Sequence, residues 1–263
     1  MTTAGTGPTG SRRAPNAHRS EPPTPPRPRA PGSGRRRRGS LTREVIVTES
    51  LRLLDTAGVE GFSLPKLGHA LGADPTAVYR HFASKDDLVL AIADRLITEA
   101  MAGLEPRQCW VETMTEQARR LRATYRKHPA AASLSSYRMT PRTAEMRTID
   151  ILIGAVLAAG FSDVRAAVVY RAIADFALAS AGSEASFLAL DERLQQADRA
   201  AWIRAYLAVD RERYPSIWQI RDDLASVSDD GIFEASWSIF IEGLRAMAPR
   251  PCCAAHAGLR EDG

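Results

Sequence analysis

Residues 63–88 constrain what this chain can fold into more than any other segment, because they hold the signals for several short helices in close succession. Ser63 and Asp74 are residues that cap helix N-termini, and each is followed by a proline in the first turn, where a missing N–H costs little. Gly72 lies between them and permits a tight turn. We therefore expect two short helices joined by a glycine-containing turn.

A third helix follows directly. Ser84 is placed to cap it, and Asp87 stands three residues later in an arrangement like a capping box. Two short helices joined in this way form a helix-turn-helix, which lays its second helix in the major groove of DNA. The segment thus predicts a DNA-binding head, and the rest of the chain is far larger than its support requires. That size suggests a second part that decides when the head binds.

The rest of the chain is helical in pattern as well, so the predicted fold class is all-α: an N-terminal helix-turn-helix domain and a C-terminal helical bundle for regulation and dimerisation. Apolar residues recur at helical spacing and no run alternates like a strand. The expected helices cover residues 41–57, 63–71, 74–82, 84–101, 110–127, 140–160, 163–181 and 230–248, with two more pieces within 191–213. The expected domains are a disordered arm (1–39), the DNA-binding head (40–103), a ligand-binding and dimerisation domain (104–249) and a flexible tail (250–263).

Composition narrows the class of protein. Of the 263 residues, 44% are hydrophobic and 25% are charged, which is ordinary for a globular protein. No apolar run has the length of a membrane span, and the N-terminus lacks the apolar stretch of a signal peptide. Three cysteines are too few for a disulfide framework. We expect a cytoplasmic protein with no membrane partner.

The charge is unevenly distributed along the chain. Residues 1–40 hold nine arginines and one acid, a net charge of +8, so the other 223 residues carry −4. This segment also contains eight of the sixteen prolines, and it has too few apolar side chains to fold. It ends in Arg35, Arg36, Arg37 and Arg38, which suit DNA phosphates or the minor groove. A solvated tail, a proline-motif ligand or a wrongly assigned start codon are the alternatives.

Three motifs lie at a distinctive spacing between Ile46 and Leu88: Leu67-x-x-x-Leu71-Gly72, Tyr79-Arg80-His81-Phe82 and Ser84-Lys85-Asp86-Asp87-Leu88. In this combination the segment resembles the TetR (tetracycline-repressor) family of bacterial transcription regulators. The resemblance implies a homodimer that represses transcription from a palindromic operator and leaves it when a small apolar or aromatic effector fills the C-terminal bundle.

The candidate DNA contacts follow from residue chemistry, and the resemblance assigns the same roles to the matching positions. Thr76 can hydrogen-bond a base or a phosphate, and Ala77 can pack against a thymine methyl group. Tyr79 and His81 can donate to phosphate oxygens. Lys85 adds a positive charge beside the free N–H groups of a helix start. Further phosphate candidates at helix starts are Thr42, Ser63 and Lys66.

Three positions depart from the family pattern. Pro65 stands near a place where relatives often carry a base-reading residue, so base contacts from that helix are doubtful. Gly68 and Glu49 both replace alanines. A glycine inside a helix costs about 0.5–1 kcal/mol relative to alanine.

The C-terminal part supplies candidates for an effector cavity and for a dimer interface. Aromatic and methionine side chains suited to an apolar cavity, or simply to core packing, are Trp110, Met114, Tyr125, Tyr137, Met146, Phe176, Phe187 and Trp202. A four-helix bundle from residues 163–182 and 229–247 of two copies would hold the dimer together. Its expected contacts, several of them at heptad-like spacing, are Val168, Phe176, Phe233, Trp237, Phe240 and Leu244.

No other chemistry emerges from the sequence. Cys252-Cys253-x-x-His256 lacks a fourth metal ligand, so we expect no metal site and no cofactor. No catalytic or nucleotide-binding motif is found, and we expect no enzyme. Two alternatives remain open: a nucleoid protein that uses the arginine arm without sequence preference, and a helical enzyme.

Overall fold

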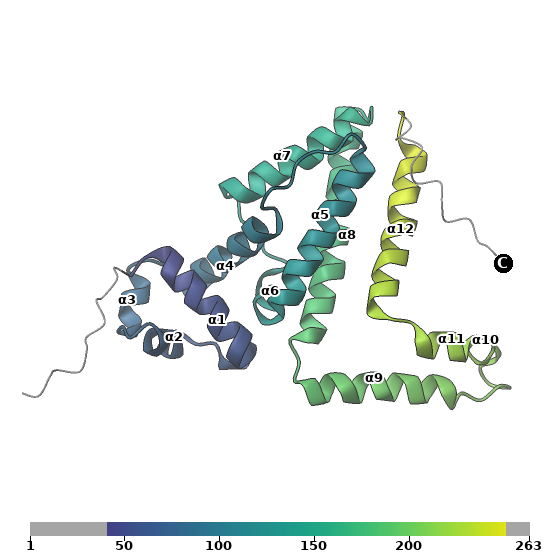
Figure 1. Ribbon diagram of the computed structural model, residues 1–263, viewed down its shortest axis with the longest axis horizontal. Helices are drawn as coiled ribbons and strands as arrows, with labels where there is room; N and C mark the ends of the chain where they lie inside the picture. The colour runs from purple at the N-terminus through teal and green to yellow at the C-terminus, as the bar shows by residue number, and fades with distance from the viewer. Residues whose placement is uncertain (1–40, 251–263) are drawn as a thin grey trace, which may run out of the picture. The chain divides into compact units, whose positions relative to one another are not determined.

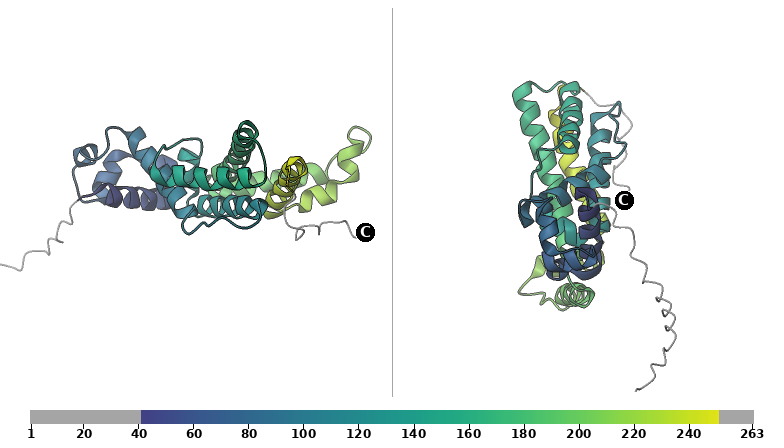
Figure 2. Two further views of the ribbon diagram at one scale, coloured as in Figure 1. Left: turned by 90° about the horizontal axis from the view of Figure 1, so that it is seen from above. Right: turned by 90° about the vertical axis from the view of Figure 1, so that its left-hand side faces the viewer.

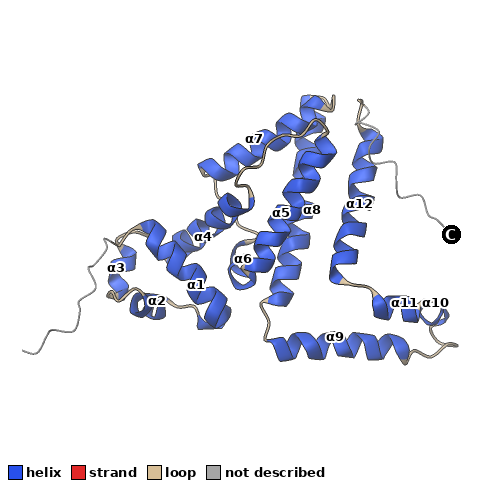
Figure 3. Ribbon diagram, viewed as in Figure 1, coloured by secondary structure: helices blue, strands red, loops and turns tan. Residues whose placement is uncertain are grey.

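The computed structural model describes residues 41–250, and all regular structure within them is α-helical, as predicted (Figures 1 and 3). The helices are α1 (Arg43–Gly61), α2 (Leu64–Ala70), α3 (Pro75–Tyr79), α4 (Lys85–Ala100), α5 (Trp110–Lys127), α6 (Pro129–Ser135), α7 (Thr143–Ala158), α8 (Asp163–Leu188), α9 (Glu192–Leu207), α10 (Pro215–Gln219), α11 (Arg221–Ser226) and α12 (Asp229–Met247). The arginine arm, the rest of the tail beyond residue 250 and the Cys252-Cys253-x-x-His256 motif lie outside the described residues.

The three predicted N-caps form as the sequence indicates. The Ser63 hydroxyl accepts a hydrogen bond from the N–H of Lys66 at 3.4 Å, and Ser84 accepts one from Asp87 at 3.1 Å. Asp74 caps α3 through a 2.8 Å bond from the N–H of Thr76. Gly72 adopts a left-handed φ of 60°, which closes the turn between α2 and α3.

Other boundaries differ from the prediction. Helix α3 ends at Tyr79, because the N–H groups of His81 and Phe82 both turn back to the carbonyl of Val78. Helix α6 was not expected. It starts at Pro129, directly after His128, the C-cap residue of α5. The segment 191–213 contains one continuous helix and then turns, whereas two helical pieces were expected.

Helix α8 runs seven residues past its expected end at Ala181, through Gly182. A Cβ atom at Gly182 would lie 2.7 Å from the hydroxyl oxygen of Ser136, just after α6. The glycine therefore permits close packing of two helices and does not end one. Helix α9 then turns away from α8 by 110° (Figures 1 and 2).

The helix-turn-helix stands on a small apolar core. Leu67 of α2 and Val78 of α3 are buried beside Phe82, which is 1% exposed, and beside residues of α1 and α4. The guanidinium of Arg43 covers the Phe82 ring, with 4.1 Å between its central carbon and the ring centre. This core fixes the orientation of α3 against α2.

Gly68 of α2 lies against the first residue of α3, and replacing it tests that packing. A Cβ atom there would lie 3.0 Å from the N and Cα atoms of Pro75, which are backbone atoms and cannot swing aside. We expect Gly68→Ala to lower the free energy of unfolding by about 1 kcal/mol, despite the better helix propensity of alanine. Gly154→Ala on α7 is the matched control, because a Cβ there meets nothing within 4 Å. Gly154→Ala should raise the free energy of unfolding by about 0.5–1 kcal/mol. Urea unfolding measures both variants. If the urea midpoints of Gly68→Ala and Gly154→Ala shift in the same direction from the wild-type value, the packing argument is contradicted.

The larger part of the chain is built on α5, α7 and α8, with α6 packed between α8 and the helices α1 and α4. Helix α12 runs along α5 (Figure 1). Trp237 of α12 is 2% exposed, and its indole N–H donates to the hydroxyl of Thr115 on α5 at 2.9 Å. The described part of the chain includes no single helix long and apolar enough to cross a membrane; α8 and α9 meet that test only as a bent pair.

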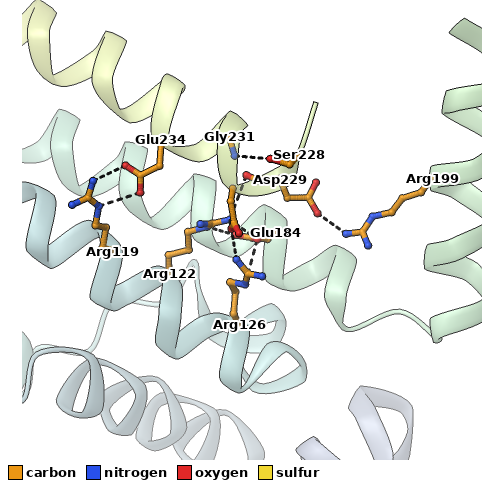
Figure 4. A network of polar contacts seen from close by, with 10 residues as sticks. Arg119, Arg122, Arg126, Glu184, Arg199, Ser228, Asp229, Gly231 and Glu234 are labelled. Atoms are coloured by element: carbon orange, nitrogen blue, oxygen red, sulfur yellow. Dashed lines mark hydrogen bonds and ion pairs between the residues drawn. The ribbon is translucent and has the colours of Figure 1, made fainter. Parts of the chain in front are cut away.

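A charged network fastens the start of α12 to α5 and α8 (Figure 4). The buried guanidinium of Arg122 donates to Glu184 at 2.6 and 2.9 Å and to Asp230 at 2.7 Å. Arg126 also binds Asp230, and Arg119 pairs with Glu234 at 2.7 Å. Arg122 thus sits at a junction of three helices.

Acid should loosen this junction. Hydrogen bonds from Arg122 and Arg126 hold the pKa of Asp230 below its usual value near 4. A lowered folded-state pKa means that the stabilisation is present above the unfolded pKa and disappears as the pH falls through the folded one. We expect near-ultraviolet circular dichroism, which reports the packing of Trp237, to change below about pH 4. Asp230→Asn should show a smaller change in that range; identical titrations would exclude the contribution of this group.

Cys109 precedes α5 and is 4% exposed. The structure contains it as a disulfide-bonded residue, which the sequence did not indicate. The other two cysteines lie outside the described residues.

Candidate nucleic-acid interface and effector cavity

The predicted DNA-contacting side chains lie at the ends of four short or capped helices. Thr76 is exposed and Tyr79 is 54% exposed on α3, so neither is covered by the larger part of the chain. Ala77 and His81 are partly exposed on and just after the same helix, and Lys85 is exposed at the start of α4. The structure leaves α3 free to enter a groove.

The hydrogen bond of Thr76 determines what this side chain can read. Its hydroxyl donates to the Asp74 carboxylate at 2.6 Å, and the same contact lowers the pKa of Asp74. The hydroxyl proton is therefore committed, and only the lone pairs of the oxygen remain. In this rotamer the Thr76 oxygen can only accept a hydrogen bond, for which the exocyclic amine of adenine or cytosine is a suitable donor.

The other hydroxyls have the opposite arrangement. The oxygens of Thr42 and Ser63 accept backbone N–H groups as helix caps, at 3.2 and 3.4 Å, which leaves each hydroxyl proton available to a phosphate oxygen. Lys66 is exposed one turn further along α2, and the Lys85 ammonium lies 5.7 Å from the centre of the Phe62 ring. These side chains can position a duplex without reading it.

Two carboxylates in the first turn of α4 are paired with arginines, which the sequence did not reveal. Arg138, from the loop after α6, donates through both terminal nitrogens to Asp86, one of the two bonds measuring 2.8 Å. Arg43 of α1 binds Asp87 at 3.2 Å and also donates to the carbonyl of His81. Arg142 reaches Asp87 at 3.4 Å. Asp87 also accepts the N–H of Ala83 at 3.2 Å, which is a capping role like the one predicted for it.

A cavity of about 670 Å³ opens between α4, α6, α7 and α8. Ala93 and Ile97 of α4 form one wall, and the charged residues Arg138, Glu145, Arg171 and Asp175 share the lining with tyrosines, aliphatic side chains and five serines. Burial and Glu145 raise the pKa values of Tyr125 and Tyr170, so both phenols stay protonated. The cavity is more polar than the apolar one that the aromatic residues of the sequence suggested.

Only Tyr125 and Tyr137 of the eight expected cavity residues line it. Met114 is fully buried, Trp110 packs edge-on against Phe161, and Phe176 stacks on Phe240. Met146 and Trp202 are 54% and 63% exposed, and Phe187 lies beneath Arg199. Of the two roles that the sequence left open, core packing applies to Trp110, Met114 and Phe176, and Met146 and Trp202 lie at the surface.

The expected dimer residues divide into two groups. Phe233, Trp237 and Leu244 are 4%, 2% and 7% exposed within this chain, so they belong to its own core, which corrects the interpretation of their spacing. Val168 is 59% exposed on α8, and Phe176 and Phe240 form a half-buried stacked pair between α8 and α12. Two further exposed apolar side chains on α12 were not foreseen: Ile232 at 51% and Ile239 at 77%.

Comparison with known families decides the assignment. The tetracycline repressor-like C-terminal domain matches residues 102–248, which is more than half of the chain, and the N-terminal domain of bacterial regulatory proteins of the tetR family matches residues 46–92. The chain belongs to the TetR family.

Relatives of this TetR-family chain occur in actinobacteria. An HTH-type transcriptional repressor of Mycobacterium tuberculosis is 30% identical over 145 residues, 53% of this chain and 56% of the relative, so the match spans little more than half of that protein. An HTH-type transcriptional regulator of Saccharopolyspora erythraea is 28% identical over 165 residues, 63% of this chain and 70% of the relative.

Solved structures agree with the TetR fold. A possible TetR family transcriptional regulator from Streptomyces coelicolor A3(2) has a TM-score of 0.66 and 28% identity, over 78% of this chain and 99% of its own. ActR from Streptomyces coelicolor, solved in complex with actinorhodin, has a TM-score of 0.69 over 80% of this chain and 99% of its own. At 23% identity the second likeness shows the fold alone.

Proposed function

We propose that this chain is a sequence-specific, DNA-binding transcriptional repressor that works as a homodimer and releases its operator when a small molecule occupies the cavity. The observation that carries the proposal is the exposed helix α3, with Thr76 and Tyr79 open to a groove and the capped start of α4 beside them. Such a regulator acts where the bacterial chromosome lies, in the cytoplasm.

The dimer follows from the size of the reading element and from the exposed apolar surface. A helix of five residues contacts too few base pairs for useful specificity, and two copies on a two-fold axis double the site. Val168, Ile232 and Ile239 give α8 and α12 the apolar side chains that a second copy would cover. A two-fold dimer implies a palindromic operator.

Helix α4 supports the proposed response to a ligand. Its middle lines the cavity through Ala93 and Ile97, and its first residue is the phosphate candidate Lys85. A ligand that binds more tightly when α4 is displaced would shift the dimer to a state in which the two DNA-binding domains no longer have their DNA-bound spacing. The coupling free energy between ligand binding and DNA binding is typically about 1–3 kcal/mol. ActR was solved with actinorhodin and a TetR variant of Acinetobacter baumannii with minocycline, which favours a small-molecule effector here.

A gel-shift titration tests the function. The purified chain should retard a DNA fragment from upstream of its own gene. Its dissociation constant for that fragment should be at least about 1,000-fold lower than for scrambled DNA of equal length. Equal affinity for both would favour the nucleoid alternative and refute specific regulation. Retardation of neither fragment would refute DNA binding altogether.

The arginine arm lies outside the described residues, and its role can be tested in the same gel shift with a variant that lacks the residues before Ser40. If it adds only phosphate contacts, its loss should weaken binding to all sequences evenly and flatten the salt dependence. A loss of discrimination between the two fragments would instead assign it a base-reading role.

A further inference from the structure

Arg138 connects the cavity to the start of α4. It lines the cavity, and its guanidinium binds Asp86, which directly follows Lys85 at the start of α4. Its side chain is 26% exposed and that of Asp86 is 61% exposed, so the pair lies at the mouth of the cavity and within reach of a ligand. No other cavity residue in the described part of the chain forms an ion pair with α4.

The ion pair is a genuine two-bond contact. Both terminal nitrogens of Arg138 donate, one to each oxygen of Asp86. These bonds lower the pKa of Asp86 and raise that of Arg138, so both groups are fully charged near neutral pH. A planar guanidinium that binds a carboxylate through its two terminal nitrogens is equally suited to bind another acid group through the same two nitrogens.

The contact leads on toward the reading helix. Asp87, the next residue, binds Arg43 and Arg142, and Arg43 donates in turn to the carbonyl of His81, just beyond α3. The first turn of α4 is thus held between arginines of both parts of the chain. Losing one of them changes the support of the turn that carries Lys85.

The other charged side chains of the cavity have polar partners that do not belong to α4. Arg171 donates to Asp175 at 2.7 Å, one turn along the same helix. Glu145 accepts the N–H and the hydroxyl of Thr140 at 2.6 and 2.8 Å. Arg138 is the lining cation whose carboxylate partner lies outside the cavity, on α4. An anionic ligand group therefore has a specific place to bind.

We propose that the effector carries an acid group, and that this group takes Arg138 from Asp86 and so frees the start of α4. The inference rests on the proposed regulatory function and adds to it the chemical class of the ligand and the residue that transmits its binding. The acid group of the effector and the Asp86 carboxylate compete for the same guanidinium. Since the Arg138–Asp86 pair holds the start of α4 in its DNA-bound position, binding of the effector and binding of DNA oppose each other.

Two fluorescent probes with the same aromatic rings test the class of ligand. Anilinonaphthalene sulfonate carries an acid group, and N-phenylnaphthylamine lacks it. The sulfonate should bind the wild-type protein more tightly and weaken its retardation of the upstream fragment, while the neutral probe leaves retardation unchanged. Equal effects of the two probes on DNA binding would overturn the proposal.

Three variants test the residue, each checked for folding by circular dichroism. Asp86→Asn removes the competitor and should tighten sulfonate binding by about threefold, the modest change expected for a partly exposed ion pair. Arg138→Gln should weaken sulfonate binding, and because it also removes the partner of Asp86, it should weaken DNA binding even without sulfonate. Arg171→Gln is the matched control: it removes the same charge from the cavity wall without touching α4, so a saturating dose of sulfonate should still release DNA.

The experiments distinguish a failure of the proposed role of Arg138 from a failure of the proposed regulatory function. The effect of Asp86→Asn on sulfonate binding requires no DNA, so it decides the competition even if wild-type protein shifts no fragment and the proposed function falls. Unchanged sulfonate affinity in Asp86→Asn, or wild-type DNA affinity of Arg138→Gln, would overturn the role of Arg138.

Discussion

Ile239→Asp is expected to split the proposed dimer into monomers and to lower the affinity for a palindromic operator by about 100-fold or more. Ile239 is 77% exposed on α12, close in sequence to the half-buried Phe240. In the proposed dimer it would be covered by the second copy, where an unpaired carboxylate is strongly unfavourable. Each monomer would then hold one short reading helix, without the second half-site to retain it.

Sedimentation and gel shift measure the two effects together. Met146→Asp is the matched control, because Met146 is 54% exposed on α7, outside the expected interface. It should remain a dimer with unchanged operator affinity. A dimeric Ile239→Asp protein with full affinity would move the interface elsewhere on the surface.

The helix-turn-helix was predictable because its signals are local. Ser63, Asp74 and Ser84 bond to N–H groups two or three residues along the chain, so the sequence order alone brings the partners together. Gly72 supplies its turn in the same way. The end of α3 was misplaced because it depends on Phe82 entering a core built by other helices.

The heptad-like seam shows where sequence reasoning stops. Its period states that Phe233, Trp237 and Leu244 share an apolar face, but not whether that face meets another copy or the chain's own α5. The structure places Trp237 against Thr115 of α5. The outward Ile239 carries no periodic signal, because its exposure depends on what α5 and α8 leave uncovered.

The cavity was hidden for a similar reason. Large aromatic residues mark places that are filled, whereas a cavity lies where small side chains leave space, as Ala93 and Ala174 do here. Arg138 and Asp86 are 52 residues apart, and only tertiary packing makes them partners. Nothing in the spacing of either residue could indicate that pairing.

Separate replacements of Thr76 and Lys85 are expected to produce two different kinds of loss. Thr76→Val keeps the branched shape and removes the lone pairs that face a base, so operator affinity should fall by about 1–3 kcal/mol for each half-site. Affinity for scrambled DNA should hardly change. Because the Thr76 proton is committed to Asp74, the affected base pair should present an amine, from adenine or cytosine.

Lys85→Ala should weaken operator and scrambled DNA alike, since a lysine on a phosphate carries no sequence information. The slope of log affinity against log salt should fall by about one for each copy, or about two for the dimer. Arg204→Ala on the exposed surface of α9 removes one positive charge far along the chain and controls for net charge. If Lys85→Ala changed discrimination but left the salt slope intact, Lys85 would contact a base, and the assignment of α3 as the sole reading helix would be wrong.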